Sequence, residues 1–532
     1  MLRFTTVLLL IYAINSCSAR RTQRDQIIFP ATDNINPAAF GNEPPTNDFL
    51  AESPWPMTHR TPYAQASSPY LGPSSISDFA PRIAKSAPPV SVTLSISSRY
   101  KSGKHGVWGY ATGEIFIIDN STWQVASRLR VIPKSTKDER SSLSGAYHLV
   151  DKENNFYVPY GLTIGRFADP TESFKVEKKA EFSVPNGKTN EMIVGFNLAF
   201  DGHIVFVTNQ GRLGYLSRDF KNYSEVFIEN HKADISNSIS IDENGGVFVL
   251  TARAIHKIQI TPNTSVTHQW EIPYTSSEQP TDGRLGSGSG TTPSLMGFGK
   301  GNDKFVVFAN GQNLMNLILV WRDELPSNWK AIGNNHPRIA AIEPITFIPL
   351  EKRVNMNLKG LTSVTEQSIL IRGYDAVVVS NKYGKPNSVM SKVVQVISDS
   401  MGRKLSLGGR VVALSNHKAV SPKGIEKFTW SSADKKLSST WANDKISCPN
   451  GIPSMSEPAG MMYCVGADID GPSNFFMGTS WTFEGINWLT GKRVFSYKTG
   501  SKFTFNSFYA GTEIGLNRAL ITGIVGGALS SK

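Results

Sequence analysis

Hydrophobic and polar residues alternate most clearly between Gly195 and Ser217, in the stretch GFNLAFDGHIVFVTNQGRLGYLS. A short apolar run is followed by an Asp-Gly turn, an alternating run, a second Gly turn and a third apolar run. Tight turns between runs of this length predict three antiparallel strands, a β-meander. Such a meander is the building unit of a β-propeller blade.

The same arrangement recurs along the chain, which predicts a repeat protein. Asp151, Asp201 and Asp242 each end an inner strand, and they lie 50 and 41 residues apart, as four-stranded blades require. More irregular copies span residues 287–308, 361–379, 459–477 and 505–521. Seven inner strands therefore predict an all-β fold, a single β-propeller of seven four-stranded blades.

Two parts of the pattern lie outside these seven repeats. The strands expected within 107–131 have no inner strand of their own, and we expect them to complete the last blade and close the ring, which removes exposed sheet edges. Insertions are expected near 322–355 and near 400–450.

The N-terminus has the features of a targeting segment. A basic Arg3 precedes an apolar run from Phe4 to Ile14, which is short for a transmembrane span, and a small-residue motif ends at Ala19. We expect a signal peptide over 1–19, an extended Pro/Ser-rich leader over 20–90 and the propeller over 91–532, without a transmembrane anchor. The expected location is extracellular; a bacterial chain would be periplasmic, or a lipoprotein if Cys17 carries the lipid.

Within the leader, the segment SPWPMTHR stands out. Trp55 and Met57 beside two prolines predict an anchor that docks on the folded body. His59 and Arg60 either reach a pocket or have packing and solvent-facing roles.

Composition supports a turn-rich β protein and limits the classes of partner. Charged residues make up only 18% of the chain, while 45 glycines and 30 prolines indicate many turns. The net charge of +12 is spread along the chain with no run of five basic residues, which argues against nucleic-acid binding. An extracellular ligand such as an acidic polysaccharide or a protein is compatible with this charge.

Cysteines and sequons fit an exported protein. Removal of the signal peptide leaves Cys448 and Cys464, which we expect to form a disulfide worth roughly 3 kcal/mol; the alternative is two buried free thiols. Three sequons predict glycosylation at Asn120, Asn222 and Asn263.

Polar residues near the starts of the inner strands are candidates for a shared site. In a propeller these strands line the axial channel, so His148, Asn197 and Asn237 would converge at its mouth, with Glu191 or Glu343 as a further ligand or general base. Such oxygen and imidazole donors suit a metal ion or a small polar ligand. The alternative is that the Asn and His side chains bond to the backbone at the crowded strand starts. The aspartates that follow are expected to stabilise turns.

Two fragments resemble known propeller families. The segment INWLTGKRVFSYKTG, at 486–500, is similar to a quinoprotein-type (PQQ) repeat, and Trp55-Pro-Met resembles the opening of exported proteins of that superfamily. The phrases ending at Asp201 and Asp242 resemble the inner strands of gluconolactonase-like and strictosidine-synthase-like propellers, which implies an axial calcium. The quinoprotein resemblance also implies a disulfide between adjacent cysteines beside the quinone. This chain has no adjacent pair, so the cofactor PQQ is not expected.

Two functions follow from these observations. The first is a secreted β-propeller that acts as an extracellular binding or matrix protein. The second is a metal-dependent hydrolase or lactonase-type enzyme with its site at the mouth of the axial channel. Fold alone does not choose between them.

Overall fold

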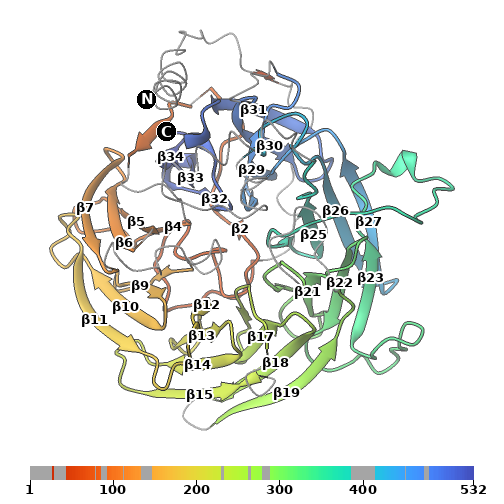
Figure 1. The fold of residues 1–532 in the computed structure, drawn as a ribbon, viewed down its shortest axis with the longest axis horizontal. Coiled ribbons are helices and arrows are strands. Elements are labelled where there is room, and N and C mark those ends of the chain that lie inside the picture. The colour runs from red at the N-terminus through yellow and green to blue at the C-terminus, as the bar shows by residue number, and fades with distance from the viewer. Residues whose placement is uncertain are drawn as a thin grey trace, which may run out of the picture.

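Eight β-sheets stand radially around one axis in the computed structural model (Figure 1). The structure describes residues 27–28, 43–77, 79–85, 93–111, 113–132, 147–228, 233–261, 265–277, 288–384, 414–449, 451–471 and 478–532. Each sheet is one propeller blade, numbered here in chain order.

The first four blades each contain four antiparallel strands, ordered from the axis outwards as they occur in the chain. Blade 1 consists of β4 (Leu94–Ile96), β5 (Gly106–Ala111), β6 (Glu114–Asp119) and β7 (Gln124–Arg130). Blade 2 consists of β8 (Leu149–Val150), β9 (Phe156–Tyr160), β10 (Thr163–Ala168) and β11 (Glu177–Ser183). Blade 3 consists of β12 (Ile193–Leu198), β13 (Ile204–Thr208), β14 (Arg212–Leu216) and β15 (Tyr223–Phe227). Blade 4 consists of β16 (Ser240–Ile241), β17 (Gly246–Leu250), β18 (Ala254–Thr261) and β19 (Ser265–Pro273).

Blades 5 to 7 repeat the same order, and blade 8 departs from it. Blade 5 consists of β20 (Ser294–Met296), β21 (Phe305–Ala309), β22 (Asn316–Trp321) and β23 (Ile339–Pro344). Blade 6 consists of β24 (Leu370–Arg372), β25 (Asp375–Val379), β26 (Ile425–Ser431) and β27 (Lys436–Asn443). Blade 7 consists of β28 (Ser454–Ser456), β29 (Met461–Ala467), β30 (Trp481–Asn487) and β31 (Arg493–Gly500), flanked by β2 (Ser67–Ser68) on the inside and β1 (Ile27–Ile28) on the outside. Blade 8 consists of β32 (Thr512–Ile514), β33 (Leu520–Ile524), β34 (Gly527–Ser530) and β3 (Arg82–Ala84).

The expected number of seven blades is wrong by one. The strands within 107–131 do not complete the last blade; they form blade 1, whose inner strand is the three-residue β4. Ring closure is carried out by β3, which pairs antiparallel with β34 as the outermost strand of blade 8. The N-terminal part of the chain therefore completes the C-terminal blade, and this is how the ring avoids an open edge.

Apolar side chains fill the spaces between the blades. The second strands, such as β13 and β17, are buried along their whole length, because both of their faces are covered by neighbouring blades. Tryptophans connect adjacent blades: the indole of Trp123 in blade 1 donates to the carbonyl of Ala528 in blade 8 at 3.0 Å.

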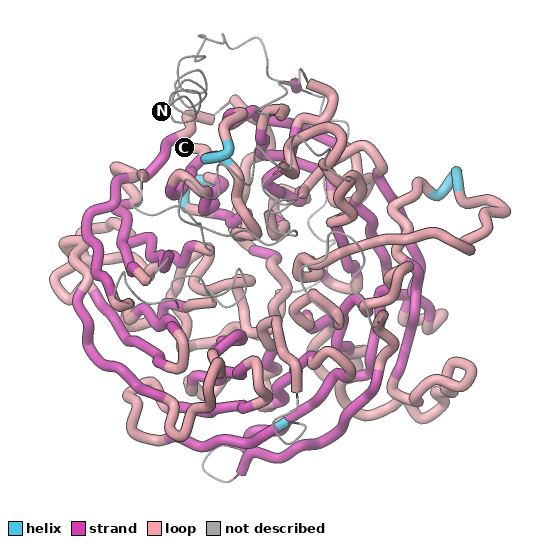
Figure 2. The backbone as a smooth tube through the Cα atoms, in the orientation of Figure 1, coloured by secondary structure: helices cyan, strands magenta, loops and turns pink. Residues whose placement is uncertain are grey.

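Among the residues that the structure describes, helical structure is confined to short 3₁₀ segments: η5 (Leu350–Lys352), η6 (Phe503–Phe505) and η7 (Leu516–Arg518). Strands and loops make up the rest of the described body (Figure 2). No helix within the described ranges is long and apolar enough to span a bilayer. The predicted signal peptide lies outside those ranges.

Candidate functional site

The leader lines the axial channel, where the sequence predicts a ligand site. Six of its backbone carbonyls accept hydrogen bonds from the inner strands of blades 1, 2, 4, 5, 6 and 7, at 2.8–3.0 Å. The carbonyls are those of Trp55, Pro56, Pro62, Tyr63, Gln65 and Ala66, and the donors are Ile96, Val150, Ile241, Leu295, Ile371 and Met455. The leader thus forms an additional layer on the axial side of these strands, and its path through the middle of the ring is visible in Figure 1.

The predicted anchor in the leader is confirmed. The side chains of Trp55 and Met57 are each 2% exposed and belong to the apolar clusters between the blades. His59 and Arg60 both have left-handed backbone conformations, with φ of 61° and 70°. Non-glycine residues adopt this region at a cost of order 1 kcal/mol or more each, so the hydrogen bonds to the blades hold the leader in a conformation it would not favour alone.

His148 lies in the channel wall with both ring nitrogens bonded to protein. Nε2 lies 2.5 Å from the carbonyl oxygen of Thr93, and Nδ1 lies 2.8 Å from the hydroxyl of Ser95. Because a carbonyl can only accept, Nε2 carries the proton and Nδ1 accepts from Ser95. Burial lowers the pKa of His148 to about 4, so the ring is neutral at pH 7.

Asn197 also serves the packing of the leader. Its Nδ2 donates to the carbonyls of Pro62 in the leader, at 3.2 Å, and of Ile239 in the next blade, at 3.0 Å. Its Oδ1 accepts from the backbone N–H of Leu198 at 2.8 Å. Asn197 therefore makes backbone bonds at a strand start, which is the alternative that the sequence left open.

The remaining predicted ligands belong to three different blades. Asn237 is half-buried just before β16. Glu191 precedes β12, but its carboxylate is 2.9 Å from Nε of Arg212 on the third strand of the same blade. Burial alone would raise the pKa of Glu191, yet hydrogen bonds from Arg212, the backbone of Lys188 and Thr208 lower it overall. Glu343 lies on β23, the outermost strand of blade 5, and not at the channel.

A small cavity lies between the leader and blade 8. It leaves about 10 Å³ for a water-sized molecule, which is room for about one water. Its lining includes Thr58 and His59 from the leader, Thr93, and Thr512 and Glu513 from β32. Burial lowers the pKa of His59 to about 4.

Glu513 is the acidic residue of this cavity, and sequence reasoning missed it. Its two carboxylate oxygens lie 2.9 and 3.1 Å from the backbone nitrogen of Leu94, and burial raises its pKa well above the ordinary value. No ion pair joins it to a Lys or Arg of the described chain. A lone Glu between Thr512 and Ile514 gives no signal in the sequence, because its position depends on how the ring closes.

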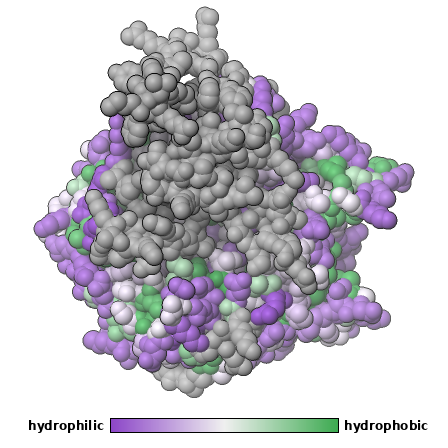
Figure 3. Space-filling view, viewed as in Figure 1, coloured by the Kyte–Doolittle hydropathy of each residue, from purple (hydrophilic) through white to green (hydrophobic). Residues whose placement is uncertain are grey.

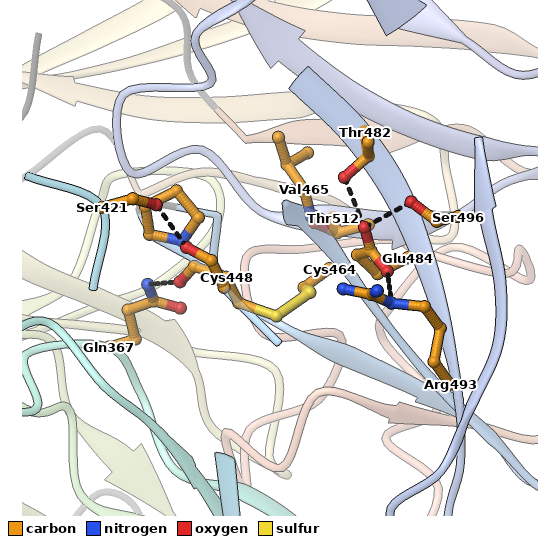
Figure 4. Close-up of a disulfide and its surroundings, with 12 residues drawn as sticks. Gln367, Ser421, Cys448, Cys464, Val465, Thr482, Glu484, Arg493, Ser496 and Thr512 are labelled. Carbon is orange, nitrogen blue, oxygen red and sulfur yellow. Dashed lines mark hydrogen bonds and ion pairs between the residues drawn. A yellow bond between two sulfur atoms is a disulfide. The ribbon is translucent and has the colours of Figure 1, made fainter. Parts of the chain in front are cut away.

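The two cysteines are paired, as predicted. The disulfide joins Cys448, in the connection from blade 6 to blade 7, to Cys464 on β29 (Figure 4). The carbonyl of Cys448 accepts a hydrogen bond from Gln367 of blade 6 at 3.1 Å. Beside it, the fully buried Glu484 accepts from Thr482 and pairs with Arg493 at 2.7 Å. This region is thus a cross-linked polar part of the core.

Most of the exposed large apolar side chains of the described residues occur on two projections of blade 5. One is the loop 322–338 before β23, and the other is the segment 345–361 after it, here called the arm, which extends from the ring in Figures 1 and 2. Seven large hydrophobic side chains of the described residues are exposed, and five of them lie on these two segments: Leu325, Ile332, Leu350, Val354 and Leu358. In Figure 3, hydrophobic residues stand among hydrophilic ones on the surface that projects at the right.

The base of the arm is fixed to blade 6. The buried carboxylate of Glu426 accepts from the backbone nitrogens of Thr346 and Phe347, at 3.0 and 2.7 Å, and pairs with Arg353 at 2.8 Å. The arm tip extends beyond these contacts, and Val354 there is 77% exposed.

Comparison with known proteins gives one relative in sequence and several in fold. No family model matches the chain. An uncharacterized protein of Archaeoglobus fulgidus is 35% identical over 513 residues, which cover 94% of this chain and 91% of that protein. The similarity therefore covers nearly the whole chain.

Two solved structures have the same fold at low sequence identity. The quinohemoprotein alcohol dehydrogenase of Comamonas testosteroni matches with a TM-score of 0.52 and 11% identity, over 90% of this chain and 79% of that one. A europium-containing methanol dehydrogenase matches with a TM-score of 0.53 and 10% identity, over 89% of both chains. The fold is thus that of a quinoprotein-like β-propeller, as the 486–500 segment indicated.

The described residues do not fit a quinone in the axial channel. The leader occupies the axial side of six inner strands, and its carbonyls are already hydrogen-bonded there. The two paired cysteines are 16 positions apart, whereas the quinoprotein resemblance implies adjacent ones. The likeness therefore extends to the fold and not to this cofactor site.

Proposed function

Because the chain belongs to the same family as the uncharacterized Archaeoglobus fulgidus protein and has a quinoprotein-like propeller fold, we propose that it is an exported binding protein. Its partner is a protein, which it recognises through the arm and the loop 322–338 of blade 5. The clustering of exposed apolar side chains on these two segments carries the proposal. Exposed apolar side chains that are concentrated on one part of a surface mark candidate sites of contact with another macromolecule.

The arm is well suited to present such a surface. Glu426 and Arg353 fix its base, and Lys352 pairs with Asp444 at 2.7 Å, so less conformational freedom is lost when a partner binds. Leu350, Val354 and Leu358 are then free to contact the partner.

The proposed export rests on the N-terminal sequence and on the sequons. Asn222 is exposed and Asn120 half-exposed, both at turns, so both can accept a glycan; Asn263 lies outside the described residues. The disulfide between Cys448 and Cys464 is compatible with an oxidising compartment.

The alternative of a metal-dependent hydrolase at the channel mouth, with Ca²⁺ as cofactor, gains no support from the channel. His148 and Asn197 use their side-chain atoms to bond the protein itself, and Glu343 lies at the rim. We therefore keep the binding role as the proposal.

Photo-crosslinking in the native host tests this proposal. A photoreactive phenylalanine analogue replaces Val354 in one variant and Leu489 in the control, since Leu489 is an exposed hydrophobic residue on blade 7. We expect a discrete protein adduct from position 354 and none from position 489. The change Val354→Asp should abolish co-purification of that protein.

Two outcomes would contradict the proposal. One is an identical set of adducts from both positions. The other is salt-sensitive binding to an acidic polysaccharide that Val354→Asp leaves unchanged, with no protein adduct, which would indicate recognition through the net positive charge instead.

A further inference from the structure

Two histidines and a glutamate converge on the outer part of blade 4. His256 lies on β18, and His268 and Glu271 lie on β19. One ligand atom from each of them falls within 4.8 Å of the others. This cluster is on the side of the ring away from the axial channel, on strands that the sequence did not single out.

A β-bulge brings the three side chains to one face of the sheet. Residues 268 and 271 are three apart, so a regular strand would point them to opposite faces. The register shifts between Lys257 and Ile258, so that His256 is opposite Glu271 while Ile258 is opposite His268. Gln269 is the extra residue, and its insertion aligns His268 with His256 and Glu271. Bulges of this kind often re-aim a side chain at a functional site.

The distances match those of ligands around one metal ion. Nδ1 of His256 is 3.1 Å from Nε2 of His268 and 3.7 Å from a carboxylate oxygen of Glu271. With metal–ligand bonds of about 2.0–2.1 Å, ligands at tetrahedral zinc are about 3.3 Å apart. Without an ion, a hydrogen bond between the two imidazoles explains the first distance, and the contact with the carboxylate is an ion pair only if His256 is protonated.

Burial differs between the three ligands in a way that suits an accessible ion. The side chain of His256 is 1% exposed, so the ion would rest on a fixed inner ligand. The side chain of Glu271 is 51% exposed and His268 is also exposed, so the ion could enter from solvent. Three protein ligands with a fourth position open to water is the arrangement of accessible zinc sites.

We propose that His256, His268 and Glu271 form a zinc site on blade 4, with the fourth coordination position open to solvent. Imidazole and carboxylate donors in this number suit Zn²⁺ better than Ca²⁺, which takes six to eight oxygen ligands. The site is independent of the proposed docking surface on blade 5.

Zinc titration of the full-length, tag-free protein tests the site. After removal of metals by a chelator, Zn²⁺ is added in competition with a chromophoric zinc indicator. We expect one tight site per chain, with affinity reduced at least about tenfold in His268→Gln and in Glu271→Gln, since each change removes one of three ligands. His336→Gln removes an exposed imidazole outside the cluster and should leave the affinity unchanged.

Two further measurements keep the result interpretable. Saturating zinc should raise the unfolding temperature of the wild type and of His336→Gln, but not that of the two ligand variants. Circular dichroism should show that these variants remain folded, because both side chains are exposed. Equal zinc affinity in all four proteins, or a wild type that does not compete with the indicator, would overturn the proposal.

Discussion

The indole N–H of Trp488 donates a hydrogen bond of 3.0 Å to the carboxylate of Asp375, across the boundary between blades 7 and 6. The next boundary repeats the contact: the indole of Trp430 in blade 6 donates to Asp303 in blade 5 at 2.9 Å. In each pair the Asp belongs to the earlier blade and also binds a lysine. The blades are therefore joined by polar contacts as well as by apolar packing.

Replacing Trp488 with Phe should weaken the boundary between blades 6 and 7. The ring would still pack, but the carboxylate of Asp375 would lose a donor, and hydrogen bonds to charged groups contribute about 1.5–3 kcal/mol. We expect a loss of this size in the free energy of unfolding, measured in urea. In the double variant with Asp375→Asn, the two losses should not add; full additivity would show that the contact contributes nothing.

Removing the leader anchor should destabilise the whole ring. Trp55 is buried between blades, and Trp→Ala changes at such positions cost about 3–5 kcal/mol. We expect Trp55→Ala to lower the midpoint of thermal unfolding by several degrees. Trp329, on the loop 322–338, is only half-buried, so Trp329→Ala is the matched control with a smaller effect. A similar effect of the two changes would mean that the leader is not part of the core.

Acid should destabilise the protein as the pH falls from about 6.5 to 4. Burial lowers the pKa of both His59 and His148 to about 4, so both are neutral in the folded protein but take up a proton on unfolding in this range. The contribution of these two histidines to the free energy of unfolding is complete above about pH 6.5, the pKa of a histidine in the unfolded chain. It is lost as the pH falls through about 4, the pKa of both in the folded protein. At 1.36 kcal/mol per pKa unit, each contributes about 3 kcal/mol.

The variant His148→Gln tests this linkage, because an amide can still donate to Thr93 and accept from Ser95. Its stability, measured in urea at pH 7 and at pH 4.5, should fall less on acidification than that of the wild type. His336→Gln, at an exposed position, should behave as the wild type does. If the stability of His148→Gln falls as much between pH 7 and pH 4.5 as that of the wild type, His148 is not a source of the acid sensitivity.

Glu513 should have the opposite effect on the pH dependence. Burial raises its pKa well above 4.5, so the folded protein holds a proton that the unfolded chain releases. The stability gained from holding this proton is complete below pH 4.5. It is lost as the pH rises toward the pKa of Glu513 in the folded protein. Glu513→Gln should therefore gain stability relative to the wild type between pH 5 and pH 8. Urea unfolding at these two pH values is the measurement, and the exposed Glu52→Gln should show no such gain.

Local repeats in the sequence revealed most of the fold. The meander between Gly195 and Ser217 is blade 3 as far as its third strand, and the aspartates at 151, 201 and 242 lie at the turns that follow the inner strands. The blade count was wrong because the three-residue β4 is not followed by the aspartate turn that marks the inner strands β8, β12 and β16, so the start of blade 1 did not match the repeat. The strand that closes the ring, β3, is equally short and pairs with residues more than 440 positions away.

The candidate sites were harder to predict for the same reason. His148 and Asn197 do lie at the channel, but their partners come from the leader or from other blades, and no local pattern reports those contacts. The cluster of His256, His268 and Glu271 depends on a bulge at Gln269, since the spacing of three residues alone would separate two of its members.

Closure of the ring by β3 has a consequence for biosynthesis. Residues 82–84 leave the ribosome early, but their partner, β34, lies more than 440 residues later in the chain, so the nascent chain holds an unpaired strand until residues 527–530 have been made. A premature stop before residue 527 would eliminate β34 and leave two sheet edges free to pair with other chains. Such a product would be a target for quality control, although seven of its eight blades would be complete.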